Sequence, residues 1–444
     1  MKNVDYVITK NNLINEGETI GVACSGGRDS MCLLHFLFTN KDVYKCKIIA
    51  VNIDHNIRVE SAKDSKFVME YCKRNNIECL SYSLDVVKYC NEKKMTLEEG
   101  AREARYNVFR NLIASGKVDK IALAHHQQDQ SETVLLNIFR GTGLSGASGM
   151  EYGKDKTFIR PMLSTSRTEI QAYIEKNNIP YVDDETNFKN DYARNYIRNM
   201  IMPLVRNMWP NADASICKFA DICRQDDKYI ATQANDTEIE TKNGVVKIKV
   251  DDFIKATPVI NRIIRNALKN IGIYKDIEKK HLDLIRQLAL TGENGSKINL
   301  PNNLLAYKEY NYIVLTNKKY QPEKKTWKLK RGKIDIQEYG IITLSTVRKF
   351  DFTAHNHIID NAKIPKDAVI RFREPGDVFE KFGGGTKSLS DYLIDKKVPT
   401  RLRNVLPVLA SGNEILVVFG VEISNKVKVD ITTKTAWAID IFRY

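Results

Sequence analysis

An apolar run that breaks into two glycines and then resumes with helical spacing constrains this chain more than any other feature. Residues 20–24 read Ile-Gly-Val-Ala-Cys, and an apolar pattern of helical period returns from Met31. Between them lies a polar turn made of Ser25, Gly26, Gly27, Arg28, Asp29 and Ser30. The pattern predicts a strand, a tight turn and a helix.

The turn has the composition of a phosphate-binding loop. Glycines lack a Cβ atom, so successive backbone N–H groups can point into one concavity, and the following helix adds the positive end of its dipole. The sequence lacks both the Gly-Lys-Ser/Thr ending of a Walker A loop and the Gly-x-Gly-x-x-Gly pattern of dinucleotide-binding loops. A plain helix cap made by Ser25, Asp29 and Ser30 is the alternative interpretation.

Length and charge indicate a globular protein of two or three domains with a polyanionic partner. The chain has 444 residues, of which 43% are hydrophobic, enough for more than one core. Its 69 Lys and Arg residues against 55 Asp and Glu residues give a net charge of +14, which favours nucleic acid as a partner. A solvated lysine-rich surface is the alternative.

Cysteine usage and hydropathy predict a soluble cytoplasmic protein without a membrane partner. All eight cysteines lie within the first 223 residues with no Cys-x-x-Cys pair, which is typical of reduced core residues and not of disulfides or a zinc site. Residues 1–10 contain no apolar signal core, and no apolar run approaches the roughly 18 residues that a membrane span needs.

Strands and helices alternate through the first two hundred residues. Apolar runs predict strands at 19–24, 47–53, 79–84 and 120–124. Helical periodicity lies between them, as at 61–75 and 97–115. The alternation predicts an α/β fold with a doubly wound parallel sheet, whose ligands bind at the carboxyl ends of the strands.

Two polar motifs follow these strands directly, at 54–58 (Asp-His-Asn-Ile-Arg) and at 125–133. In the second motif, Asp129 and Glu132 stand three apart where a helix begins, so they share a face. Paired carboxylates there can hold Mg²⁺ on ATP, or bind and deprotonate an amine nucleophile, and the sequence leaves open which carboxylate does which. Acidic residues that favour a helix amino terminus are the alternative.

Two pairs of arginines occupy single helix faces. Arg102 and Arg105 are three apart on a predicted helix, and Arg194 and Arg198 are four apart on a later one. Either pair can reach a phosphate or a carboxylate if its helix flanks the nucleotide pocket, whereas surface ion pairing is the default. A glycine-rich loop at 141–150 is predicted to close over substrate or simply to connect two elements.

These motifs, in this order, resemble those of bacterial tRNA(Ile)-lysidine synthetases, a family of the PP-loop ATP pyrophosphatase superfamily. The resemblance is dense over about residues 15–205. It rests on the polar turn, on Arg160-Pro161-Met162-Leu163 and on the segments 54–58, 101–106, 125–133, 140–146, 184–187 and 194–198. Asn56 departs from the family pattern, which often has Gly at that position.

The resemblance implies a PP-loop domain, similar to the adenine nucleotide alpha hydrolases, that uses ATP and Mg²⁺. It implies adenylation at C2 of the first anticodon cytidine of the tRNA(Ile) with a CAU anticodon, followed by displacement of AMP by the ε-amino group of L-lysine. Carried over residue by residue, the catalytic set is Asp29, Asp129, Glu132, Arg105 and Arg194, and residues 25–30 bind ATP. Asp29 and Asp129 are the metal candidates.

The rest of the chain is predicted to bind tRNA. We expect the catalytic domain at 1–205, a helical connector and a small mixed α/β domain that contacts tRNA at 206–322, and a small α+β tRNA-binding domain at 335–444. Basic residues beside glycines and aromatics suit phosphate contacts. The residues predicted to contact tRNA are Arg198, Arg371, Lys387, Arg401 and Arg403.

Two other functions stay open at this point. A PP-loop tRNA thiolase would use a sulfur nucleophile, but such enzymes usually need catalytic cysteine pairs, which the spacing here does not offer. A noncatalytic RNA-binding protein is the second alternative, although the intact glycine and acidic motifs argue against it. The sequence leaves the oligomeric state open, a homodimer included.

Overall fold

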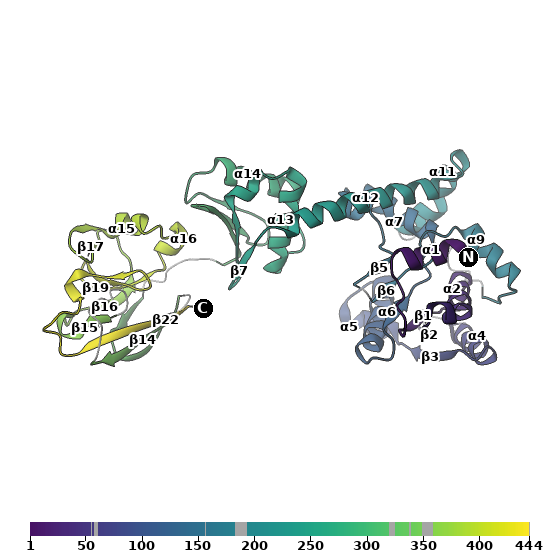
Figure 1. The fold of residues 1–444 in the computed structure, drawn as a ribbon, viewed down its shortest axis with the longest axis horizontal. Helices are drawn as coiled ribbons and strands as arrows, with labels where there is room; N and C mark the ends of the chain where they lie inside the picture. Colours follow the sequence, from purple (N-terminus) through teal and green to yellow (C-terminus); the bar gives the residue numbers. More distant parts are fainter. Residues whose placement is uncertain are drawn as a thin grey trace. The chain divides into compact units, whose positions relative to one another are not determined.

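A computed structural model gives the fold of residues 1–54, 56, 61–155, 157–182, 193–318, 325–336, 339–348 and 358–443 (Figure 1). The chain divides into two units, Met1–Tyr229 and Ile230–Tyr444. The first unit contains one sheet and the second contains three, and each unit has two buried apolar clusters among the described residues.

The first unit is built on a six-stranded sheet with the order β3-β2-β1-β4-β6-β5. All neighbours pair in parallel except β5 and β6, so the predicted doubly wound parallel sheet is confirmed. The strands are β1 (Thr19–Ala23), β2 (Lys47–Asp54), β3 (Glu78–Ser83), β4 (Lys120–Ala122), β5 (Gly153–Lys154) and β6 (Phe158–Ile159). The four predicted strands are all present.

Helices connect these strands. They are α1 (Lys2–Lys10), α2 (Arg28–Thr39), α3 (Lys41–Tyr44), α4 (Ser61–Arg74), α5 (Val86–Lys93), α6 (Leu97–Ala114), α7 (Gln127–Phe139), α8 (Leu144–Ala147), α9 (Arg167–Lys176), α10 (Ala193–Tyr196) and α11 (Met202–Met208). A π-helical segment, Ile197–Ile201, joins α10 to α11, and α12 (Ala212–Asn235) continues into the second unit.

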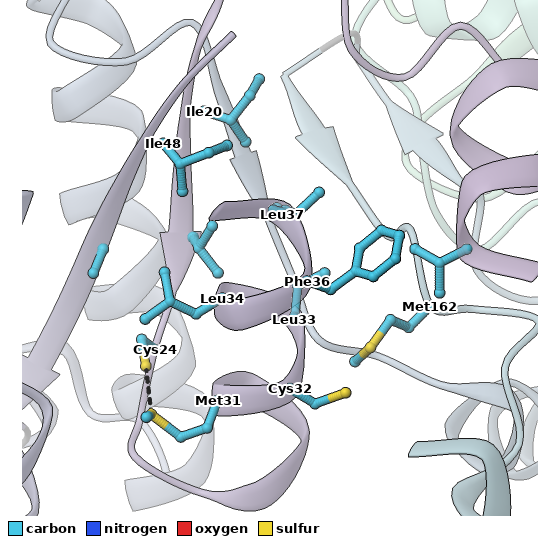
Figure 2. Close-up of a cluster of buried hydrophobic side chains, with 14 of the residues drawn as sticks. Ile20, Cys24, Met31, Cys32, Leu33, Leu34, Phe36, Leu37, Ile48 and Met162 are labelled. Carbon is cyan, nitrogen blue, oxygen red and sulfur yellow. Dashed lines mark hydrogen bonds between the residues drawn. The ribbon is translucent and has the colours of Figure 1, made fainter. Parts of the chain in front are cut away.

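Alternate side chains of the central strands enter two different cores. Ile48 and Ala50 of β2 pack with α2 on one face of the sheet, whereas Ile49 and Val51 pack with α6 on the other. Figure 2 shows Leu33, Leu34 and Leu37 of α2 in the same cluster as Ile20 of β1 and Ile48 of β2. Because α2 is fixed to the sheet in this way, the turn between β1 and α2 has a defined position at the carboxyl end of β1.

The second unit begins with a five-stranded antiparallel sheet in the order β7-β8-β11-β10-β9. Its strands are β7 (Glu240–Lys242), β8 (Val245–Lys249), β9 (Lys297–Asn299), β10 (Leu305–Glu309) and β11 (Tyr312–Thr316). Helices α13 (Thr257–Asn270) and α14 (Lys279–Thr291) share its core. A small mixed α/β region is therefore present where the sequence predicts one.

Two further sheets share one core in the remainder of the chain. The seven-stranded sheet contains β12 (Thr326–Lys328), β16 (Val369–Phe372), β17 (Val378–Glu380), β18 (Thr386–Ser388), β19 (Pro407–Ser411), β20 (Glu414–Val418) and β21 (Glu422–Ile423). The four-stranded sheet contains β13 (Gly332–Ile336), β14 (Gly340–Val347), β15 (Ile358–Asp360) and β22 (Ala436–Arg443), and the helices are α15 (Leu389–Asp395) and α16 (Thr400–Arg403). The predicted α+β class is confirmed, and the domain limits stay predictions.

Cysteine burial agrees with the expected core positions. Five of the eight cysteines are buried: Cys24, Cys32, Cys72, Cys90 and Cys223. None of the helices in the described ranges has both the length and the apolar character that crossing a bilayer requires.

Candidate active site

The turn between β1 and α2 is held by its own side chains. Gly26 has a φ of +88°, in the left-handed region that favours glycine, and a Cβ there would lie 3.3 Å from Val68 Cγ2. Ser30 Oγ donates to the Gly27 carbonyl at 2.8 Å and accepts from the Ser25 N–H at 3.2 Å. The N-cap position of α2 is occupied by Gly27, so Ser25, Asp29 and Ser30 shape the loop and do not form a conventional cap.

His126 links this loop to the amino terminus of α7. Its Nδ1 accepts from the Gln128 N–H at 3.2 Å, while the backbone N–H of His126 donates to Asp129 Oδ2 at 3.1 Å, a reciprocal capping box. Its Nε2 lies 3.5 Å from Asp29 Oδ2 and 3.6 Å from Asp129 Oδ2. One imidazole thus stands between a carboxylate of the glycine loop and a carboxylate of α7.

Two arginines hold the two carboxylates of α7. Arg198 donates to both oxygens of Glu132, from Nε to Oε1 and from Nη2 to Oε2, each at 2.8 Å, and its Nη2 is 3.0 Å from Asp129 Oδ1. Arg194 lies 3.3 Å from Asp129 Oδ1 through Nη2 and 3.3 Å from Glu132 Oε2 through Nε. The Glu132 side chain is only 2% exposed, whereas the side chains of Arg194 and Arg198 are 29% and 31% exposed.

The surrounding charges favour the ionised forms of Asp129, Arg198 and His126. Burial alone would raise the pKa of Asp129, but His126, His125 and Arg194 lower it to about 2. The hydrogen bond to Glu132 raises the pKa of the Arg198 guanidinium against the effect of burial. Burial would lower the pKa of His126, yet the charge of Asp129 and the hydrogen bond and charge of Asp29 raise it. The cluster therefore combines opposed full charges in a partly buried setting.

A cavity of about 290 Å³ opens beside the glycine loop. Arg105 lines it, and its buried Nε has no hydrogen-bond partner within the described ranges, while burial lowers the pKa of its guanidinium. His125 lines it too; burial lowers the pKa of this imidazole to about 3, so it is neutral and accepts from Arg160 Nε at 3.2 Å. The other lining residues are Ala23, Cys24, Ser25, Ser30, Val51, Ile53, Tyr106, Phe109, Leu123 and Ala124.

The predicted carboxylates, arginines and glycine loop thus gather at one edge of the sheet. Arg102 lies over the Tyr106 ring at 5.2 Å from its centroid and does not line the cavity. Several residues of the predicted motifs lie outside the described residues. They are His55, Ile57, Arg58, the acidic segment 183–187 and Tyr192. Asn56 has a φ of +47°, a conformation that glycine adopts freely and asparagine tolerates, which accounts for the departure from the family pattern.

The predicted tRNA-contacting residues of the second unit are engaged within the protein. Arg371 makes a bidentate buried pair with Asp377 at 2.7 and 3.0 Å. Arg401 Nε lies 2.7 Å from Glu309 of the middle sheet, with both side chains buried. Lys387 pairs with Asp395 at 2.6 Å but is exposed, and Arg403 donates to the Val398 carbonyl at 2.8 Å. Their contacts with tRNA stay predictions.

Some contacts of the site have no signal in the sequence. The contact of His126 with Asp29 and the hydrogen bond from Arg160 to His125 join residues that are far apart along the chain. A further one joins Ser131 of α7 to Asp213, which also pairs with Arg206 at 2.7 Å. The sequence marks this region as a site only through the density of polar residues at 125–133.

The glycine loop, the sheet order and the cavity are those of a nucleotide-binding α/β domain. Residues 2–205 match the family model described as PP-loop domain, and residues 368–441 match the one described as TilS substrate C-terminal domain. A tRNA(Ile)-lysidine synthase of Clostridioides difficile (strain 630) is 34% identical over 455 residues, covering 98% of this chain and 97% of its own. One of Clostridium acetobutylicum is 34% identical over 459 residues, covering 100% and 99%.

The chain belongs to the tRNA(Ile)-lysidine synthase family. Among solved structures, a U34-tRNA thiolase from Methanococcus maripaludis is 15% identical with a TM-score of 0.43, covering 50% of this chain and 78% of its own. That similarity is too low to bear on function.

The lowered pKa of Asp129 predicts a pH-dependent contribution to stability. The pKa of Asp129 is about 2 in the folded protein and 3.8 ordinarily, so ionised Asp129 stabilises the folded state. This stabilisation is present above pH 3.8 and is lost as the pH falls toward 2. We expect Asp129→Asn to lower the free energy of unfolding by about 2 kcal/mol at pH 5, and the difference to shrink by about half at pH 3. Urea denaturation at both pH values measures it.

Asp42→Asn, at an exposed position of α3, is the matched control and should show no such change. A stability difference for Asp129→Asn that stays constant from pH 5 to pH 3 would contradict the charged cluster described above.

Proposed function

We propose that this protein makes lysidine in tRNA(Ile) with a CAU anticodon, using ATP and free L-lysine. The observation that carries the proposal is the position of Asp129 and Glu132 on one turn of α7, where His126 lies between Asp129 and Asp29 of the glycine loop. A reaction that first needs ATP and then an amine requires anionic groups beside a phosphate loop. The full-length relationship to lysidine synthases favours this function over a thiolase or a noncatalytic RNA-binding protein.

In the first step the C2 carbonyl oxygen of the cytidine attacks the α-phosphorus of ATP, and the bond to pyrophosphate breaks. The backbone N–H groups at Gly26 and Gly27 and the amino terminus of α2 suit the phosphates. The apolar walls of the adjoining cavity suit the adenine ring, and Arg105, with its unpartnered Nε, suits an anion or a base edge there.

Mg²⁺ fits the carboxylates nearest the glycine loop. The described residues contain no cluster of three or more His, Cys, Asp or Glu side chains that could bind a metal. Mg²⁺ on a nucleotide usually takes one or two carboxylates together with phosphate oxygens and water. Asp29 and Asp129, which approach the same imidazole nitrogen, fit that requirement, and the ion would neutralise charge on the phosphates.

In the second step the lysine ε-nitrogen attacks C2, and the C–O bond to AMP breaks. The ε-amine has an ordinary pKa of about 10.4, so fewer than about one molecule in a thousand is unprotonated at neutral pH. A nearby carboxylate must bind the ammonium and accept its proton. We assign this role to Glu132, because Asp129 is engaged with His126, whose imidazole also approaches Asp29 of the glycine loop.

The product itself is the first test. Unmodified tRNA(Ile) transcript incubated with the protein, ATP, Mg²⁺ and isotopically labelled L-lysine should yield a nucleoside with the mass of cytidine plus lysine minus water. Digestion to nucleosides and mass spectrometry measure it. The methionine tRNA with the same anticodon is the control substrate and should gain no lysine. A sulfur-bearing nucleoside, or no modified nucleoside, would contradict the proposal.

Amide variants of the two carboxylates should separate the two steps. Glu132→Gln removes the proton acceptor, so we expect normal pyrophosphate release with at least about a hundredfold loss of lysidine formation. Asp129→Asn, the matched variant three residues away, should lose pyrophosphate release as well. Lysidine formation by Glu132→Gln at near-normal rate would contradict the assignment.

A further inference from the structure

Every oxygen of the α7 carboxylate pair, Asp129 and Glu132, already accepts at least one hydrogen bond. Glu132 Oε1 accepts from Arg198, and Oε2 accepts from Arg198 and Arg194. Asp129 Oδ1 accepts from both arginines, and Oδ2 accepts from the His126 N–H. With Glu132 only 2% exposed, a lysine ammonium cannot reach these oxygens while the guanidinium groups stay in place.

Charge balance leads to the same requirement. Two carboxylates and two guanidinium groups make a neutral cluster, so it offers a third cation little electrostatic attraction. If the two arginines turn to another anion, the carboxylates regain a net charge of about −2 and become a site for an ammonium group.

The arginines are placed for such an exchange. Arg194 and Arg198 lie at the start of a helix that passes through the π-helical segment Ile197–Ile201, a conformation often found at functional sites. Each keeps nearly a third of its side chain exposed. Arg198 is connected to the glycine loop by a short chain of contacts: its Nη2 lies 3.0 Å from Asp129 Oδ1, and His126 Nε2 lies 3.6 Å from Asp129 Oδ2 and 3.5 Å from Asp29 Oδ2. A phosphate held in that loop would therefore lie close to this cluster of charges. Guanidinium groups bind phosphate in the same bidentate manner as carboxylate.

We propose that Arg194 and Arg198 exchange partners during the reaction, from Asp129 and Glu132 to the phosphates of the bound nucleotide, and thereby open the lysine site. This proposal rests on the proposed function and adds an order to it: the nucleotide creates the affinity for lysine. It also explains how the ammonium is kept away from the carboxylates until a phosphate is present. Arg194 and Arg198 are positioning residues in this scheme.

Lysine binding with and without a nucleotide tests the exchange. Equilibrium dialysis of ¹⁴C-labelled L-lysine against the full chain is performed alone and with α,β-methylene ATP, whose methylene group replaces the oxygen lost in pyrophosphate release. We expect the analogue to lower the Kd of lysine by about tenfold or more. By reciprocity, saturating lysine should tighten binding of the analogue by the same factor.

Arg198→Met frees Glu132 Oε1 permanently, so this variant should bind lysine without the analogue, and the analogue should change its Kd by less than about threefold. Arg206→Met is the matched control, since Arg206 is as exposed as Arg198 and pairs with Asp213 instead. It should keep the nucleotide dependence. Arg198→Lys retains the charge, so its nucleotide dependence of lysine binding should lie between those of Arg198→Met and Arg206→Met. This variant replaces Arg198→Met if the methionine variant fails to fold.

Equal lysine affinity with and without the analogue in the unmodified protein would overturn the exchange, while lysidine formation in the product assay would keep the proposed function. No lysine binding under any condition, together with no lysidine, would overturn both. Nucleotide dependence that survives in Arg198→Met would also refute the exchange.

Discussion

Two carboxylates on α7 and two guanidinium groups on the helix that begins at Ala193 neutralise one another in a partly buried setting, and the active site depends on that balance. An unpaired Glu132 at 2% exposure would be strongly destabilising, because a buried charge without a partner loses its hydration without compensation. The ion pairs join α7 to residues more than sixty positions away. They therefore hold the helix that carries Arg194 and Arg198 against α7, and the same contacts set the geometry of the site.

The parallel sheet brings the remaining parts to this cluster. Because β1, β2 and β4 run in the same direction, the segments that follow them meet at one edge. The glycine loop follows β1, and His125 and His126 follow β4 closely. Packing of α2 against the sheet holds the loop, as Figure 2 shows for Leu34 and Ile48. His126 then connects the loop to α7 through Asp29 and Asp129.

Patterns of neighbouring residues predicted the strands, the helices and the residue types of the site. Which side chains pair with one another depends on tertiary contacts. The strand at 47–53 and the helix at 97–115 follow from apolar periodicity, which depends on neighbours in sequence. The shared face of Asp129 and Glu132 follows from helix geometry. That Arg194 and Arg198 pair with these carboxylates, and that Arg371 and Arg401 are buried in ion pairs, depends on contacts that spacing does not encode. Charge counting could not separate a buried arginine from an exposed one.

We expect one active site to catalyse both steps, adenylation of the tRNA and then attack by the lysine ε-nitrogen, with adenylated tRNA as a discrete intermediate. A single-turnover experiment with α-³²P-labelled ATP, unmodified tRNA(Ile) and no lysine tests it most directly. We expect label to appear on the tRNA to about one per active site, in step with pyrophosphate release, and added lysine to convert it to free AMP with formation of lysidine. Release of labelled AMP without lysine at the same rate, or no label on the tRNA, would contradict it.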